Sequence, residues 1–224
     1  ALPSPAAALR GAIESAESGI IKAILVGPAA RIKDVAAKHG LNISGYEIVD
    51  TPPTEAAAAA RSVELIHEGK GEALMKGSLH TDEIMRAVTA KVGGLRTDRR
   101  ISHVFIMDVP TYHKVLLVTD AAINIAPTLE DKVDICQNAI DLAVTLGVHT
   151  PKVAILAAVE TVNSKMPATL DAAALCKMAD RGQITHGLLD GPLALDNAIS
   201  SDAERMPLIR AASLLIALSN ASGP

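Results

Sequence analysis

The stretches "KVLLVTD" (residues 114–120), "PTLEDKVDICQNAIDLAVTLG" (127–147) and "KVAILAA" (152–158) follow one another and decide the fold class. The first and third are apolar runs of strand length, whereas the middle one places apolar residues at helical spacing. A strand, a long helix and a second strand in this order predict a crossover unit in a mainly parallel sheet.

The middle stretch has the clearest helical pattern in the chain. Its apolar residues recur every three or four positions and predict one buried stripe: Leu129, Val133, Cys136, Ile140 and Ala143. Thr128 and Asp131 have the spacing of a capping box, so we expect the helix to begin just after Thr128.

The same alternation runs through the rest of the chain and predicts an α/β fold with mainly parallel sheets. The expected strands are residues 20–27, 46–50, 72–77, 102–109, 114–120, 152–158 and 184–191. The expected helices are residues 28–40, 54–69, 80–94, 127–147, 169–182 and 208–218. Ligands of such sheets gather at the carboxyl ends of the strands. Polar pairs follow four of the apolar runs: Lys76-Gly77, Thr119-Asp120, Glu160-Thr161 and Asp190-Gly191.

The composition narrows the classes of function. The 224 residues admit one domain or two small ones, and 49% are hydrophobic, enough for a sizeable core. With no Trp, two Tyr, one Phe and a net charge of −4, the chain lacks the features of nucleic-acid binding. Its two cysteines have no metal-ligand spacing and favour a reduced, cytoplasmic setting. Because a long apolar run is absent, we expect neither a membrane span nor a signal peptide.

Lys76 and Arg86 form the first candidate site. Lys76 would end a strand, and the free N–H groups of a helix beginning near Thr81, together with Arg86, would attract an anion. The alternative is a solvated lysine and a surface arginine on an ordinary helix. The lack of a P-loop or a GxGxxG motif favours this alternative.

Two further candidates also have plain structural explanations. Asp120, with Asn124 behind it, could bind a metal or cap a local turn. Asn163 and Lys165 could belong to a ligand loop, or to an ordinary loop before a helix whose N-cap is Thr169. The seven histidines are scattered and there is no GxSxG motif, so a metal centre and a serine nucleophile are not expected.

Long motifs in the chain resemble the phosphate acetyl/butyryltransferase family. They are "EALMKGSLHTDEIMRAV" (72–88), "DVPTYHKVLLVTDAAINIAPTLEDKVDICQNAIDLA" (108–143), "AVETVNSKMPATLDAAALCKMADRGQI" (158–184) and "LLDGPLALDNAIS" (188–200). Within it, the chain is most similar to the phosphate acyltransferase domain of bifunctional enoyl-CoA hydratase/phosphate acetyltransferases. The resemblance implies two three-layer α/β domains with mainly parallel sheets and an inter-domain cleft. Residues 1–107 and 207–224 would form the first domain, and residues 108–206 the second.

The resemblance also implies an activity. The family converts acyl-CoA and orthophosphate reversibly into acyl phosphate and CoA, an acyltransferase reaction of the EC 2.3.1 type, as a homodimer. CoA is a substrate, and no metal or redox cofactor is implied. Arg86 matches the arginine that the family places near the phosphoryl group. The other matching residues lie in motifs that line the cleft and are expected to bind substrate: Lys76, Thr119, Asp120, Asn163, Lys165, Asp190, Gly191 and Pro192.

The chain departs from the family after Ser200. The family continues into a Ser-Arg motif that supplies a thiol-contacting serine and a second phosphate-contacting arginine, and neither that motif nor the family's base aspartate has a match here. The junction of Met206 and Pro207 is therefore expected to be a seam. One alternative is a catalytically inactive domain that senses acyl-CoA or oligomerises. Another is a decarboxylating dehydrogenase of the isocitrate type, for which a set of metal-binding aspartates is missing.

Overall fold

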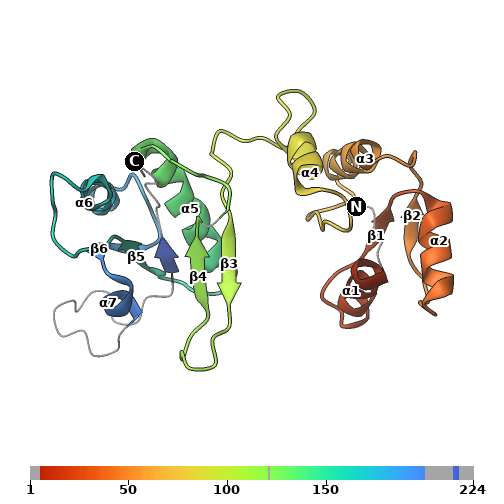
Figure 1. Cartoon of the computed structure of the whole chain (residues 1–224), viewed down its shortest axis with the longest axis horizontal. Helices are drawn as coiled ribbons and strands as arrows, with labels where there is room; N and C mark the ends of the chain where they lie inside the picture. Colours follow the sequence, from red (N-terminus) through yellow and green to blue (C-terminus); the bar gives the residue numbers. More distant parts are fainter. Residues whose placement is uncertain (1–5, 121, 200–213, 217–224) are drawn as a thin grey trace. The chain divides into compact units, whose positions relative to one another are not determined.

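The chain forms two compact units, Ala1–Asp98 and Arg99–Pro224. A computed structural model describes residues 6–120, 122–199 and 214–216 (Figure 1). The resemblance implies a domain boundary after Met107, and strand β3 (Val104–Met107) pairs within the sheet of the second unit. The predicted seam between Met206 and Pro207 lies outside the described residues.

In the first unit, helices pack around a short parallel pair of strands. Its elements are α1 (Ala6–Glu17), β1 (Ile24–Val26), α2 (Ala29–Lys38), β2 (Glu47–Val49), α3 (Glu55–His67) and α4 (Thr81–Val88). Strands β1 and β2 run parallel, with Leu25 opposite Ile48. One apolar cluster joins α1, β1 and α2 through Leu9, Leu25 and Ile32, and a second joins α3 to α4 through Ala58 and Ile84.

The second unit is built on a five-stranded sheet. Besides β3, its elements are β4 (Leu116–Thr119), α5 (Leu129–Thr145), β5 (Lys152–Leu156), α6 (Pro167–Asp180), β6 (Leu188–Leu193), α7 (Leu195–Ile199) and β7 (Leu214–Ile216). The strand order is β3-β4-β7-β5-β6, in which β3 is antiparallel to β4 and the other four strands run parallel. The predicted crossover from β4 through α5 to the parallel strand β5 is confirmed, with β7 between the two strands.

Helices cover both faces of this sheet, so the unit has three layers. On one face α5 and α6 bury the largest cluster, which includes Leu117, Ile140 and Ile155. On the other face Leu116 and Leu193 pack with Ala198 of α7. None of the helices in the described part of the chain has the length and apolarity that a membrane crossing needs.

Helix α5 begins and packs as its sequence predicts. Thr128 is the N-cap, and its side chain and that of Asp131 form the expected capping box. The buried stripe is wider than predicted, because Ile135 and Ala139 are as fully buried as Cys136. Leu129 and Val133 lie at the margin of the stripe and are only partly buried.

Three parts of the sequence form structures that the pattern did not predict. Residues 72–77 are not a strand, since Met75 and Lys76 are exposed and none of the strands that the structure describes pairs with them. Residues 214–216, expected in a helix, form a strand because pairing with β4 and β5 and full burial of Ile216 outweigh local preference. Helix α1 was not expected. The remaining residues of the segment 207–224 lie outside the described part of the chain.

A buried ion pair joins α5 to α6 and makes the packing of these helices sensitive to one substitution. Lys132 is fully buried, and its Nζ lies 2.5 Å from Oδ2 of Asp171. Asp171→Asn leaves a buried ammonium without its carboxylate, so we expect it to lower the free energy of unfolding by about 3 kcal/mol in urea titrations followed by circular dichroism.

The matched control is Asp180→Asn, also on α6. Asp180 pairs with Lys177 at 2.8 Å, but both side chains are about two thirds exposed, so its loss should leave the unfolding midpoint unchanged. Equal losses in the two variants would show that the buried pair has no special importance.

Candidate functional site

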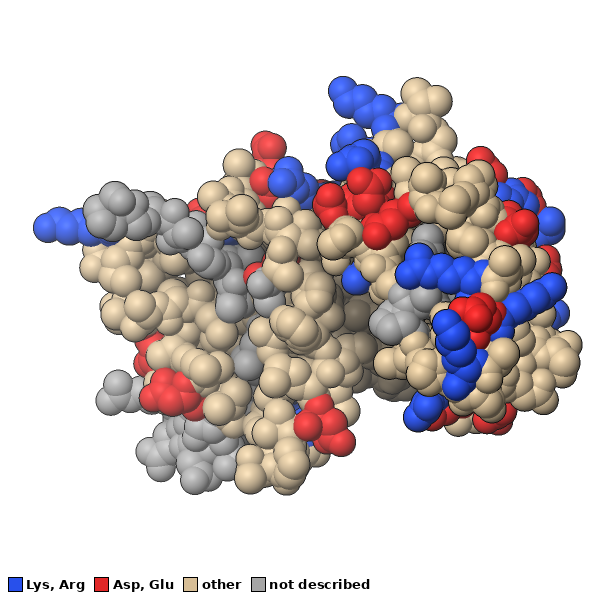
Figure 2. Space-filling model, turned by 45° about the vertical axis from the view of Figure 1, so that its right-hand side comes forward, with Lys and Arg blue, Asp and Glu red and all other residues tan. Residues whose placement is uncertain are grey.

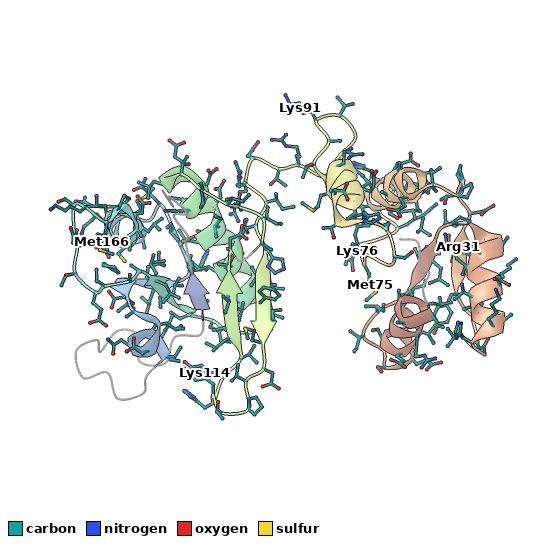
Figure 3. The ribbon with its side chains drawn as sticks, viewed as in Figure 1. Arg31, Met75, Lys76, Lys91, Lys114 and Met166 are labelled. Atoms are coloured by element: carbon teal, nitrogen blue, oxygen red, sulfur yellow. The ribbon has the colours of Figure 1, made fainter. Side chains whose placement is uncertain are left out.

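In the first unit, Lys76 lies in the segment between α3 and α4 and not at a strand end (Figure 3). Its Nζ donates a hydrogen bond to the carbonyl oxygen of Leu79 at 3.1 Å, and the residue is exposed. Leu79 itself is fully buried against α3 and α4. Lys76 is therefore an exposed cation whose position is tied to the start of α4.

Arg86 lies in the last turn of α4, and its side chain reaches back toward the first turn, as helical side chains do. One guanidinium nitrogen lies 2.8 Å from Oε1 of Glu83, and another lies 3.8 Å from Oδ2 of Asp82. The Arg86 side chain is 69% exposed. The structure therefore shows a surface arginine paired on its own helix, and the anion-binding role of Arg86 stays a prediction.

The N-terminus of α4 has no side-chain cap. The N-cap residue is His80, whose backbone N–H donates to Oε2 of Glu55 at 2.7 Å, so α3 holds the first turn of α4 in place. Asp82 and Glu83 in this turn complement the positive end of the helix dipole. An anion binding here would have to compete with these two carboxylates.

In the second unit, Thr119 is at the carboxyl end of β4, as predicted. Its side chain is fully buried, and its hydroxyl donates to the carbonyl oxygen of His103 at 2.6 Å. This bond ties the end of β4 to the segment that precedes β3. The hydroxyl of Thr119 is thus engaged within the fold.

Asp120 caps the turn that follows β4. Its carboxylate accepts the backbone N–H groups of Ala122, Ile123 and Asn124 at 3.1, 3.1 and 3.2 Å, and the side-chain amide of Asn124. Burial alone would raise the pKa of Asp120, but these hydrogen bonds outweigh it and the pKa is lowered. The structure thus shows the local turn that was one of the two alternatives for Asp120.

Asn163 organises the loop between β5 and α6. Its side-chain oxygen accepts the backbone N–H of Lys165 at 2.9 Å, and its own N–H donates to the hydroxyl of Thr169 at 2.9 Å. The sequence suggested Thr169 as the N-cap of α6, and this prediction is wrong. The N-cap is Met166, and Thr169 lies inside the first turn. The side chain of Lys165 is left on the exposed surface.

Asp190, Gly191 and Pro192 lie inside β6 and not at its end, because the strand continues to Leu193. Asp190 pairs with Ala154 across the sheet, and its carboxylate accepts the N–H of Gly191 at 2.9 Å. These residues therefore form part of a packed sheet, with Pro192 buried.

Cys176 of α6 lies against this strand. Its thiol contacts the carbonyl oxygen of Gly191, with 3.7 Å between sulfur and oxygen. Burial, helped by the negative charges of Asp190 and Asp180, raises the pKa of Cys176 to about 12. The thiol is therefore protonated at neutral pH and is not a nucleophile.

Sequence reasoning missed the polar contacts that hold these loops. Asn197 of α7 donates its side-chain amide to the carboxylate of Glu160, which follows β5. Arg100 donates to Asn124 at 2.7 Å, next to the turn that Asp120 caps. The basic run 96–100 and the acidic residues of α5 carry opposite charges, and that complementarity was the available signal.

Charges of both signs are interspersed on the face shown in Figure 2. The described residues include no group of three or more His, Cys, Asp or Glu side chains that could hold a metal ion. The predicted residues therefore fall into two sets: Lys76 and Arg86 in the first unit, and three loop or strand segments in the second.

A mainly parallel sheet with helices on both faces and polar groups at its strand ends defines the class of α/β proteins that bind small molecules at that edge. Within this class, the chain belongs to the phosphate acetyl/butaryl transferase family, which matches residues 55–208.

Relatives extend the match to most of the chain. The phosphate acetyltransferase of Rhizobium meliloti is 61% identical over 204 residues, which cover 91% of this chain and 64% of that protein. The phosphate butyryltransferase of Clostridium acetobutylicum is 44% identical over 190 residues, covering 85% of this chain and 63% of that protein. The structure of a branched-chain phosphotransacylase from Enterococcus faecalis V583 has a TM-score of 0.68 at 32% identity, covering 76% of this chain and 62% of that one. The chain thus spans less than two thirds of each relative.

Gly191 is required by the close approach of β5. A Cβ atom at this position would lie 2.7 Å from the carbonyl oxygen and 2.8 Å from Cβ of Ile155. Because Ile155 is buried in the centre of the sheet, Gly191→Ala should lower the free energy of unfolding by about 1–3 kcal/mol.

In the control Gly11→Ala, the new methyl group has no atom within 4 Å and lies in helix α1. The control should be at least as stable as wild type in the same urea titration. Equal stability of the two variants would contradict the packing argument.

Asp120 also predicts a pH dependence of stability. Its folded pKa lies below the unfolded value of about 3.9, so its contribution is fully present above about pH 4 and is lost as the pH falls through the folded pKa. We expect Asp120→Asn to be less stable than wild type at pH 7, and the difference to shrink as the pH is lowered. Urea titrations between pH 7 and pH 3 measure it, with the exposed Asp98→Asn as the control. A difference that stays constant with pH would contradict the prediction.

Proposed function

We propose that this chain transfers a short acyl group reversibly between CoA and orthophosphate. The observation that carries the proposal is the 61% identity with the phosphate acetyltransferase of Rhizobium meliloti over 91% of the chain. Relatives named for acetyl and for butyryl transfer both match, so a short acyl chain is the common element.

The proposed reaction balances with the two substrates alone. In the direction that consumes acyl phosphate, a carboxylate removes the proton of the CoA thiol, whose pKa near 8.5 leaves it mostly protonated at neutral pH. The thiolate attacks the carbonyl carbon, the bond from that carbon to the phosphate oxygen breaks, and phosphate leaves with the electron pair. Neither a metal nor a redox cofactor is needed for the balance.

Arg86 is proposed to hold the phosphoryl group and to offset its charge as it leaves. An exposed ion pair contributes little to stability, so exchanging Glu83 and Asp82 for a phosphate oxygen costs little. A guanidinium binds phosphate through two parallel hydrogen bonds, a geometry that a single ammonium lacks. Arg86 reaches the carboxylates of the first turn of α4, the end of the helix whose free N–H groups favour an anion, and this supports the proposal.

The other predicted residues are proposed to bind or support the substrates. Lys76 and Lys165 bring exposed ammonium groups suited to phosphate. Thr119, Asp120 and Asn163 act by fixing the loops that carry them, given how their side chains are bonded. Asp190, Gly191 and Pro192 shape the strand beside β5, and we propose no acid or base role for Asp190.

We further propose that the protein acts as a cytoplasmic homodimer. Both cysteines are free thiols, which suits a reducing compartment. Edge strand β3 has no charged residue, and its Phe105, Ile106 and Met107 are about half exposed, a composition that monomers usually avoid at an edge. Light scattering during size-exclusion chromatography measures the mass of the assembly.

The activity is tested by CoA-dependent phosphorolysis. Acetyl-, propionyl- and butyryl-CoA are each mixed with orthophosphate and the purified chain, and the released thiol is followed with a thiol reagent. Release that requires phosphate is expected with at least one substrate. No release, with acetyl-CoA binding retained in calorimetry, would instead support an acyl-CoA-binding domain without catalysis.

Arg86→Ala should lower kcat/KM for phosphate by about a hundredfold, because it removes a charge-assisted contact to the leaving group. The matched control is Arg61→Ala, since Arg61 on α3 also pairs with two carboxylates, those of Glu64 and Glu68. Both variants should unfold at the wild-type urea concentration, and the control should keep wild-type kinetics. An unchanged phosphate dependence in Arg86→Ala would remove Arg86 from the proposed site.

A further inference from the structure

Arg100, among the first residues of the second unit, is bonded on both sides of the loop between β4 and α5, whose described residues 122–128 are hereafter the β4–α5 loop. Nε of Arg100 donates to Oδ1 of Asn124 at 2.7 Å, near the beginning of the loop. NH1 of the same guanidinium lies 3.2 Å from Oδ1 of Asp131, in the first turn of α5 just after the loop ends. One side chain therefore bridges the first half of the loop to the first turn of the helix that follows it.

Both partners of Arg100 also fix the backbone of the loop. The side-chain amide of Asn124 donates to the carboxylate of Asp120 and, at 3.0 Å, to the carbonyl oxygen of Ile101. The carboxylate of Asp131 accepts the backbone N–H of Thr128 at 2.9 Å, which closes the capping box. This N–H bond and the charge of Arg100 lower the pKa of Asp131. Removing Arg100 would thus loosen the turn at one end of the loop and the helix cap at the other.

Helix α5 fixes the main chain of Arg100 as well. The N–H of Arg100 donates to Oδ2 of Asp134 at 2.8 Å, and its carbonyl oxygen accepts the side-chain amide of Asn138 at 2.8 Å. The guanidinium is therefore presented from an anchored backbone. Its planar fork offers donors in two directions, which a single ammonium on a flexible stem does not do.

We propose that Arg100 is a positioning residue for substrate binding, acting through Asn124 and Asp131 to set the shape of the β4–α5 loop. The loop leaves the carboxyl end of β4, the edge at which parallel sheets of α/β proteins bind ligands. The effect on substrates rests on the proposed function, whereas the effect on the loop does not.

Three variants separate the bridge from simple charge. Arg100→Met removes the guanidinium, and Arg100→Lys keeps the charge without the fork. The control is Arg99→Met, because Arg99 is similarly exposed and pairs with Asp141 of α5 at 2.5 Å. Asp141 lies about 15 Å along the helix from Asp131, away from the loop.

Hydrogen exchange of the intact chain, read by mass spectrometry in peptides that cover residues 122–128, tests the loop directly. Exchange should be about tenfold faster in both Arg100 variants and unchanged in Arg99→Met. Unchanged exchange in Arg100→Met, or wild-type exchange in Arg100→Lys, would overturn the proposal. This measurement needs no activity, so failure of the proposed function does not affect it.

Kinetics test the consequence for the substrate. Both Arg100 variants should lower kcat/KM for acyl-CoA phosphorolysis by about a hundredfold, with Arg99→Met at the wild-type value. If the wild-type chain has no turnover, the affinity for acetyl-CoA replaces the rate and should fall about tenfold in both Arg100 variants. Faster exchange of the loop with wild-type kinetics or affinity would overturn the positioning role.

Discussion

The second unit depends on the division of α5 into two faces. A stripe of fully buried residues, among them Ile135, Ala139 and Ile140, packs on the sheet, and burial of this stripe fixes the helix in place. Acidic residues lie on the face of α5 that points away from the sheet. Asp131 and Asp134 receive the incoming chain at Arg100. One helix therefore supplies both the main core contact and the anchor for the loop at the strand end.

Several predicted site residues are engaged with the fold itself. Asp120 accepts three backbone N–H groups, and the hydroxyl of Thr119 is bonded to a carbonyl oxygen. A carboxylate stabilised in this way keeps its charge at neutral pH and is a poor base, because its pKa is lowered. What such residues offer a ligand is a fixed arrangement of loops, which lowers the entropic cost of binding.

The sequence predicted those elements whose signals are local and repeated. The stripe and cap of α5 span many residues, so the helix and its first residue could be placed. The strand at 214–216 could not, because three apolar residues favour helix and strand alike, and pairing with β4 and β5 decides between them. Asp190 was misplaced because a Gly-Pro pair normally ends a strand, whereas here Gly191 allows β6 to approach Ile155 closely. The bridge of Arg100 joins residues far apart in the chain, and composition alone shows only that their charges are complementary.

The contrast between two cations indicates where binding energy is available. Lys132 is fully buried and paired with Asp171, so a substrate could reach its ammonium group only if the packing around it opened. Arg86 is mostly exposed, and its pairs with Glu83 and Asp82 are already weakened by water. A phosphate that displaced these carboxylates would gain a bidentate, charge-assisted contact and lose little in return. Both carboxylates would repel the phosphate unless their side chains turned away, and the exposure of their helix leaves them room to do so. Binding at Arg86 therefore requires local rearrangement of side chains, whereas recruiting Lys132 would require the core to open.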